Sequence, residues 1–345
     1  MKMFFFIILL SITQNVFAQG LTPQDWGLRE YHIKHKELGD IYYYVTREGL
    51  DTEKPLLFIV QGSGGLPSMI YVKFGESSTQ LGTLPADFIS RYSDKFHVAY
   101  MAKPGTSFCD TITVEEFNPM DILENFPQSR EFKEHCDLAW QVQASSIVID
   151  ALKAEIPISG DKIIAVGVSE GGRVIPWLAV ENNSITHVVC MLSGGLNHFY
   201  DSIINNRIDA ASGEISHQQA QSNIDSLFCV YEDIYKYPDS IDKSWYGHTY
   251  KRWASFCTDI PLEHLVKLTI PIFVLSGSTD RNQPILQADY IKLEFLKLKK
   301  TNLTYHVMPG VDHFLYEVIV EDGKEKGISH RDEGFNLVVS WIDSN

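Results

Sequence analysis

The chain has 345 residues, of which 44% are hydrophobic and 21% charged, and its formal net charge is −15 at pH 7. This composition is typical of a globular protein with a sizeable core in one large domain or two ordinary ones. The acidic balance and the lack of a basic stripe exclude nucleic acid as a partner, because nothing would neutralise its phosphates.

The N-terminus has the pattern of a signal peptide. Lys2 precedes the apolar run 4–10, and Val16-Phe17-Ala18 fits the small-x-small cleavage rule. We therefore expect residues 1–18 to be removed and residues 19–345 to form a secreted or periplasmic domain. The apolar run is too short for a stable membrane span, which needs about 20 residues.

Export would place the five cysteines in an oxidising compartment, where disulfides form. Because five is an odd number, at least one cysteine would remain unpaired. Cys190 lies in an apolar run and is interpreted as a buried thiol. Cys109 with Cys136, and Cys229 with Cys257, are then the two disulfide pairings considered, although the sequence does not decide connectivity.

Along most of the chain, strand-like runs are followed by helical patterns. The strand-like runs are either continuously apolar or switch between apolar and polar residues. The predicted strands cover residues 31–35, 41–45, 56–60, 97–101, 162–168, 186–192, 270–275 and 303–307, the last of which is taken as the final strand. The predicted helices cover residues 137–155, 174–180, 284–298 and 336–342. This order predicts an α/β fold with a mainly parallel central sheet and helices on both faces.

One segment, from about residue 197 to 262, interrupts this alternation. It is polar and rich in aromatic residues, and a structureless loop of that length is unusual. We expect an inserted, largely helical lid over the carboxyl ends of the strands. The alternative is a second structural layer with no role in a site.

A Gly-x-Ser-x-Gly signature joins the predicted strand 162–168 to the helix that follows. Gly167 and Gly171 allow the sharp turn of a nucleophile elbow, with the Ser169 hydroxyl exposed at its tip. The helix N-terminus behind it favours a developing negative charge. The alternative is an ordinary glycine-rich turn with a surface serine.

A nucleophilic serine needs a histidine base and an acid residue that holds the base. Where the serine stands at a strand-to-helix turn of a parallel sheet, the Asp or Glu and then the His follow it along the chain, each after a strand. Asp280 follows the strand 270–275, and His313 follows the strand 303–307. Asp280 would otherwise cap the next helix, and Asp312 is the weaker alternative for the acid. The pattern therefore predicts a Ser169-Asp280-His313 triad.

Acyl transfer also needs donors for the tetrahedral oxyanion. One is the backbone N–H of Glu170, directly after the serine. The other is expected from the glycine-rich loop 61–65, with Ser63 the first choice and Gly64 the second. The alternative is an ordinary strand-to-helix turn.

These motifs together resemble the α/β-hydrolase superfamily. The matching pieces are residues 62–65, 167–171, 277–280 and 310–313. Gln61 departs from the histidine that many relatives carry before the first glycine, which matters little if the donor is backbone. A serine at the nucleophile position, where the epoxide hydrolase and dehalogenase branches carry aspartate, argues against those branches.

The resemblance and the residues predict a secreted serine hydrolase that cleaves a carboxylic ester through an acyl-enzyme on Ser169, because an aromatic lid favours bulky apolar groups. No cofactor or metal motif is present in the sequence. An alternative is an aminopeptidase of the prolyl-peptidase-like branch, in which Glu232 and Asp233 would bind a substrate amine. A third is a non-catalytic ligand-binding relative. The oligomeric state is not predicted.

Overall fold

The computed structural model describes residues 22–321 and 324–345, so the predicted signal peptide lies outside the described residues. Its centre is an eight-stranded sheet in the order β1-β2-β6-β3-β8-β9-β12-β13. β2 runs antiparallel to both neighbours, and the strands from β6 to β13 are parallel. The strands span Leu28–His35 (β1), Gly39–Thr46 (β2), Lys54–Val60 (β3), His97–Met101 (β6), Ile158–Val168 (β8), His187–Met191 (β9), Ile272–Gly277 (β12) and Leu303–Met308 (β13).

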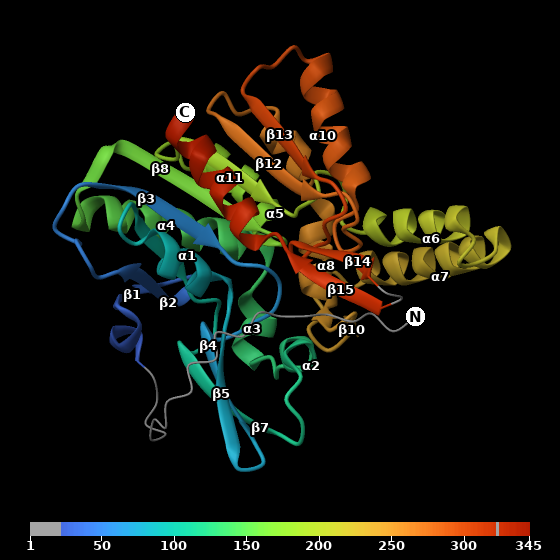
Figure 1. Cartoon of the computed structure of the whole chain (residues 1–345), viewed down its shortest axis with the longest axis horizontal. Coiled ribbons are helices and arrows are strands. Elements are labelled where there is room, and N and C mark those ends of the chain that lie inside the picture. Colours follow the sequence, from blue (N-terminus) through green and yellow to red (C-terminus); the bar gives the residue numbers. More distant parts are fainter. Residues whose placement is uncertain (1–21, 322–323) are drawn as a thin grey trace.

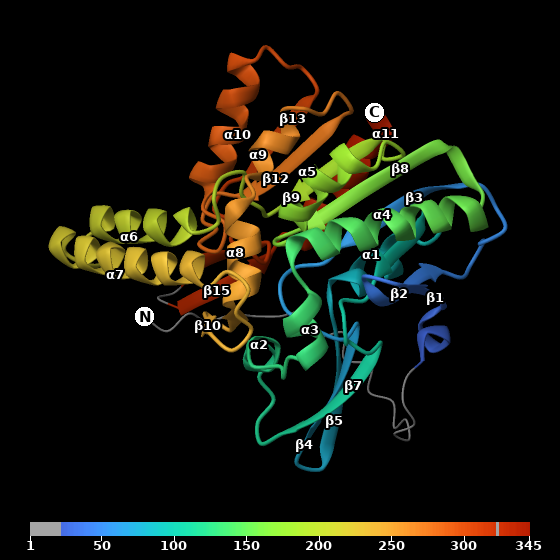
Figure 2. The same ribbon diagram turned by 180° about the vertical axis from the view of Figure 1, so that it is seen from behind.

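Helices cover both faces of the sheet (Figures 1 and 2). Each face buries its own apolar cluster against them, because central strands such as β3 carry hydrophobic residues on both sides. The helices of one face are α1 (Leu84–Tyr92) and α11 (Arg331–Ser344), and those of the other are α4 (Leu138–Glu155), α5 (Gly171–Glu181), α9 (Pro261–Leu265) and α10 (Ile285–Lys297). A short 3₁₀-helix, Pro23–Trp26, precedes β1.

The register of the central strands brings three loops together at one edge of the sheet. Val60 pairs with Gly167, so the glycine-rich loop leaves β3 beside the turn that carries Ser169. Gly277 pairs with Met308, so the loops after β12 and β13 also start side by side. Parallel strands thus place these loops where such sheets form their sites.

Three small sheets were not predicted, one of which, β10-β11 (Ser244–Trp245 and His248–Thr249), lies within the inserted segment. A three-stranded sheet of order β5-β4-β7 forms from Met69–Phe74 (β4), Ser77–Gly82 (β5) and Cys109–Val114 (β7), beside α2 (Pro119–Glu124) and α3 (Arg130–His135). After β13 the chain forms a hairpin of Tyr316–Glu321 (β14) and Lys324–Ser329 (β15). The strand at 303–307 is therefore the last of the central sheet and not of the chain.

The inserted segment 197–262 is largely helical. It contains α6 (Tyr200–Ser212), α7 (His217–Lys236), the short strands β10 (Ser244–Trp245) and β11 (His248–Thr249), and α8 (Tyr250–Thr258). The α6–α7 hairpin extends away from the sheet in both views (Figures 1 and 2). That this segment acts as a lid stays a prediction.

Much of the aromatic content of this segment forms a core of its own. The buried ring of Phe199 stacks on the buried rings of Tyr231 and Trp253, and Trp245 packs against both of these. Tyr246, in contrast, is 80% exposed. The aromatic residues therefore stabilise the insertion itself, and only part of them is available to a ligand.

The two disulfide pairings considered from the sequence are wrong. Cys136, Cys229 and Cys257, which lie among the described residues, are free thiols, so neither pairing forms. Cys229 is exposed on α7, whereas Cys257 is buried in α8, where burial raises the pKa of its thiol to about 12. Cys190 is buried in β9, as expected.

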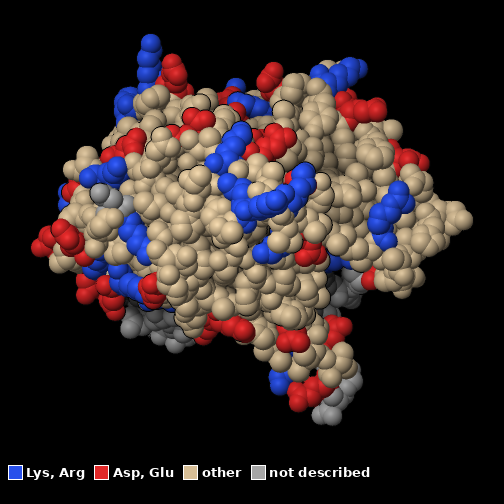
Figure 3. Space-filling view, turned by 90° about the horizontal axis from the view of Figure 1, so that it is seen from above, with Lys and Arg blue, Asp and Glu red and all other residues tan. Residues whose placement is uncertain are grey.

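Acidic and basic side chains are both scattered over the face shown in Figure 3. In the part of the chain that the structure describes, no helix combines the length and apolarity needed to cross a bilayer. Among the same residues, no group of three or more His, Cys, Asp or Glu side chains is placed to hold a metal ion.

Candidate active site

Ser169 stands at a tight turn between β8 and α5. Its φ is 55°, in the left-handed region that non-glycine residues rarely adopt, and strain of this kind concentrates at functional sites. A Cβ at Gly167 would collide with the carbonyl of Gly171, and one at Gly171 with the carbonyl of Val60. The two glycines of the signature are therefore required by the close approach of the backbone around the serine.

The structure brings Ser169, Asp280 and His313 together. His313 Nε2 lies 3.0 Å from Ser169 Oγ, and His313 Nδ1 lies 2.8 Å from Asp280 Oδ2. Because an ionised carboxylate only accepts hydrogen bonds, Nδ1 carries the ring proton and Nε2 is left to accept the serine proton. This arrangement is the one that makes a serine hydroxyl nucleophilic.

Asp280 has two functions in its loop. Its side chain is 1% exposed, and Oδ1 accepts the backbone N–H groups of Asn282 and Gln283, each at 2.8 Å. Asp280 does not cap α10, whose N-cap is Pro284 without a side-chain cap bond, so the capping alternative is wrong and Oδ1 stabilises the turn before that helix. The carboxylate is fixed by its own turn before it orients the imidazole.

Asp312, the alternative acid, is used elsewhere. Its Oδ1 accepts the N–H groups of Phe314 at 2.8 Å and Tyr316 at 2.9 Å. Its own N–H donates to the carbonyl of Tyr316. Asp312 therefore shapes the loop that carries His313, and Asp280 contacts the ring.

The expected oxyanion donors lie on two segments that flank Ser169. A Cβ at Gly62 would lie 3.6 Å from Ser169 Cβ, so the loop after β3 passes directly over the serine. Gly64 has a φ of 88°, a conformation that favours glycine. The N–H of Gly65 donates to Gln128 Oε1 at 2.5 Å, so Ser63 and Gly64 remain the candidates from this loop.

The carboxylate of Glu170 is buried although the residue follows the nucleophile. Its side chain is 2% exposed and contacts Lys103 Nζ at 2.9 Å, Gln141 Nε2 at 2.9 Å and the Arg252 guanidinium. Burial alone would raise the pKa of this carboxyl, but the Arg252 and Lys103 charges outweigh it and hold the pKa well below its ordinary value. Glu170 is therefore an ionised carboxylate within the protein.

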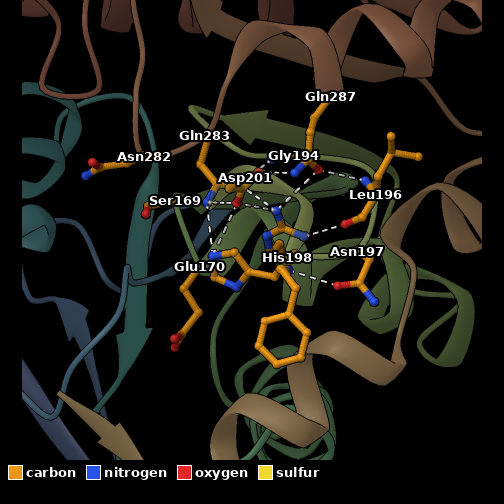
Figure 4. A network of polar contacts seen from close by, with 12 residues as sticks. Ser169, Glu170, Gly194, Leu196, Asn197, His198, Asp201, Asn282, Gln283 and Gln287 are labelled. Carbon is orange, nitrogen blue, oxygen red and sulfur yellow. Dashed lines mark hydrogen bonds and ion pairs between the residues drawn. The ribbon is translucent and has the colours of Figure 1, made fainter. Parts of the chain in front are cut away.

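A second buried network links the insertion to the loop of Asp280 (Figure 4). Asp201, at the start of α6, accepts hydrogen bonds from Arg173 at 3.2 Å, from Gln283 at 3.2 Å and from Gln287. Gln283 Oε1 in turn accepts from Arg173 at 2.8 Å. Burial raises the pKa of the Asp201 carboxyl to about 7, although Arg173 favours its ionised form.

Sequence reasoning missed the residues of both networks. Arg173 had the clearest signal, since this charged residue directly precedes the apolar run 174–180 of a helix expected to be buried. Lys103 and Arg252 had no such signal, because Lys103 stands before Pro104-Gly105, where a surface turn is expected, and Arg252 follows Lys251 in a segment that carries several other charges. Their role depends on contacts with distant parts of the chain.

No family model matches the chain, and no curated protein matches its sequence. Solved structures match its fold. The structure of DcsB in complex with its substrate analogue is 11% identical with a TM-score of 0.51, over 92% of this chain and 99% of that one. Dipeptidyl peptidase 4 of Porphyromonas gingivalis is 10% identical with a TM-score of 0.52, over 92% of this chain but only 35% of the peptidase.

The chain has the α/β-hydrolase fold. The strand order, the helices on both faces and the likeness to these structures agree on this point, which confirms the predicted fold class. Identities near 10% show the fold alone, and a fold of this kind hosts many functions. The function therefore depends on the residues of the site and not on the fold.

Proposed function

We propose that the protein is a serine hydrolase that cleaves a carboxylic ester through an acyl-enzyme on Ser169. The observation that carries the proposal is the chain of contacts from Ser169 Oγ to His313 Nε2 at 3.0 Å and from His313 Nδ1 to Asp280 at 2.8 Å. The left-handed backbone of Ser169 supports it, because that strain presents the hydroxyl outside the sheet.

Each residue then has a defined part in the reaction. Ser169 attacks the carbonyl carbon while His313 takes the hydroxyl proton, and Asp280 orients the ring and stabilises its positive charge. The backbone N–H groups of Glu170 and of Ser63 or Gly64 stabilise the oxyanion. His313 gives its proton to the leaving alcohol and then activates the water that releases the acid.

The ester assignment is preferred over the aminopeptidase alternative because, of the two residues expected to bind an amine, one is paired with a lysine and the other is exposed on the surface. Asp233 pairs with Lys243 at 2.6 Å, and Glu232 is exposed on α7. The peptidase alternative retains support from the fold that this chain shares with dipeptidyl peptidase 4 of Porphyromonas gingivalis.

The test is a panel of p-nitrophenyl esters of increasing acyl length beside aminoacyl anilides, with labelling by a fluorophosphonate probe. We expect turnover of esters, labelling of Ser169 and little turnover of anilides. Faster turnover of the anilides would favour the aminopeptidase. The absence of both turnover and labelling would favour the non-catalytic relative.

Asp280→Asn should lower kcat by about 10⁴-fold with a modest change in KM, because the neutral amide no longer holds the imidazole tautomer or stabilises its charge. Asp312→Asn is the matched control. It should cost much less activity, since Asp312 bonds backbone groups of its own loop. A larger loss for Asp312→Asn in the same ester assay would show that the acid is wrongly assigned.

We also propose that the protein is exported after removal of residues 1–18 and that the insertion 197–262 acts as a lid. N-terminal sequencing of protein from the natural producer should begin at Gln19. Detection of Met1 in that protein would contradict the export proposal. Support for the lid comes from Asp201 and Arg252, which join the insertion to the loops around Ser169.

A further inference from the structure

Lys103 is a buried cation that joins the two segments on either side of Ser169. It lies in the loop after β6 and is 5% exposed. Its Nζ donates to the carbonyl of Gly62 at 2.5 Å and to Glu170 Oε1 at 2.9 Å. One ammonium group thus bonds both segments that are proposed to stabilise the oxyanion.

The bond to Gly62 acts on the first of these donors through the peptide plane. The carbonyl of Gly62 and the N–H of Ser63 belong to the same peptide unit, which is planar and trans, so the two groups point in opposite directions. A fixed direction for the carbonyl is therefore a fixed direction for the Ser63 N–H. This favours Ser63 over Gly64 as the donor.

The bond to Glu170 acts on the second donor. Three elements hold the Glu170 carboxylate: Lys103 after β6, Gln141 on α4 and Arg252 on α8 of the insertion. The guanidinium of Arg252 is itself covered by the rings of Trp253 and Phe256, 5.1 and 4.9 Å from their centroids. Because the side chain is anchored so firmly, the backbone of Glu170 next to Ser169 has little freedom to move.

We propose that Lys103 is a positioning residue that holds the N–H groups of Ser63 and Glu170 in the orientation needed to bind the oxyanion. This inference rests on the proposed function. Lys103 touches neither the triad nor the substrate in the proposal; it acts through Gly62 and Glu170. Arg252 makes the same anchor dependent on the insertion.

The local charges allow the lysine to be removed without unpairing a carboxylate. Lys103 and Arg252 together carry two positive charges against the single negative charge of Glu170. Lys103→Met leaves the neutral pair of Glu170 and Arg252, so the variant is expected to fold. Its side chain is similar in length, which limits the cavity that the substitution creates.

The test compares Lys103→Met with the wild type in two measurements. One is kcat/KM for p-nitrophenyl acetate, and the other is the inhibition constant of benzeneboronic acid, whose tetrahedral adduct on the serine places an oxygen in the oxyanion site. We expect kcat/KM to fall and the inhibition constant to rise by a common factor of roughly 10 to 100, less than or comparable to the loss of a whole donor. The midpoint of the pH profile of kcat/KM should not move, because the triad is untouched.

Two further variants keep the result interpretable. Lys95→Met removes a lysine that pairs with Asp343 at the surface and should leave both constants unchanged. Lys103→Arg retains the charge but replaces the compact ammonium group by a planar guanidinium with a different donor geometry. Both constants should therefore shift together by a smaller factor. The arginine variant supplies the test if the methionine variant does not fold.

A fall in kcat/KM without a matching loss of boronate affinity would overturn the proposal, as would a shifted pH midpoint. Unchanged constants in a folded Lys103→Met, or in Lys103→Arg if only that variant folds, would also overturn it. Failure of the proposed function has a different appearance in the wild type itself, which would then either cleave aminoacyl anilides faster than esters or neither cleave the ester nor bind the boronate.

Discussion

Ser169→Ala should lower kcat for ester hydrolysis by about 10⁶-fold and abolish fluorophosphonate labelling, because no acyl-enzyme forms without the serine oxygen. The fold should persist, since the substitution removes only a half-buried hydroxyl that bonds His313. Far-ultraviolet circular dichroism and the thermal midpoint would check folding, and the ester assay would check rate.

Ser222→Ala is the matched control for this change. Ser222 lies exposed on α7, in the hairpin that extends away from the sheet, and the variant should keep full activity and labelling. Retention of more than about a hundredth of the wild-type rate in purified Ser169→Ala would mean that another residue is the nucleophile.

Glu170→Gln should destabilise the protein by about 3–5 kcal/mol, because it leaves Lys103 and Arg252 buried together without the carboxylate that neutralises them. The free energy of unfolding in urea at pH 7 measures the effect. Glu232→Gln is the control, since Glu232 is exposed on α7 and its replacement should change stability by less than about 0.5 kcal/mol.

The pH dependence of that difference follows from the direction of the Glu170 pKa. The folded-state pKa lies well below the ordinary value of 4.5, so the carboxylate stabilises the folded state fully above that value. The advantage of the wild type over Glu170→Gln should be complete at pH 7 and should decrease as pH falls below about 4.5. An advantage that stays constant down to pH 3, or that grows on acidification, would contradict this account.

The central sheet could be predicted because its strands are marked by local pattern. Runs such as 56–60 and 270–275 are apolar on both faces, and β3 and β12 are found there. The Gly-x-Ser-x-Gly turn is equally local, since close backbone contacts require both glycines. Asp280 and His313 followed from their position after consecutive strands of the predicted sheet.

The small sheet β5-β4-β7 could not be predicted in the same way. Its central strand β4 pairs with β7 across a separation of about 40 residues, and β5 is polar and half exposed. The hairpin of β14 and β15 is largely exposed on both faces and has no buried alternation to mark it. Such strands are fixed by tertiary neighbours more than by their own sequence.

The buried ion pairs of Glu170 with Lys103 and Arg252 could not be predicted from local sequence pattern for a related reason. Lys103 and Glu170 are 67 positions apart, and Glu170 and Arg252 are 82 apart. Charged residues are expected at the surface unless they are paired, and nothing near any of the three in sequence indicates its partner. The disulfide pairings failed likewise, because cysteine spacing carries no information on which side chains face each other.

The order of the site residues along the chain has a consequence for how activity arises during synthesis. Ser169 is made 144 residues before His313, and the whole insertion and three strands of the sheet, β9, β12 and β13, are added between them. In the proposed mechanism the serine therefore has no base until residue 313 has emerged and β12 and β13 have docked beside β9. A ribosome-bound or truncated product without His313 would carry the proposed nucleophile without its base, so we expect reactivity toward esters only once the fold around both residues is complete.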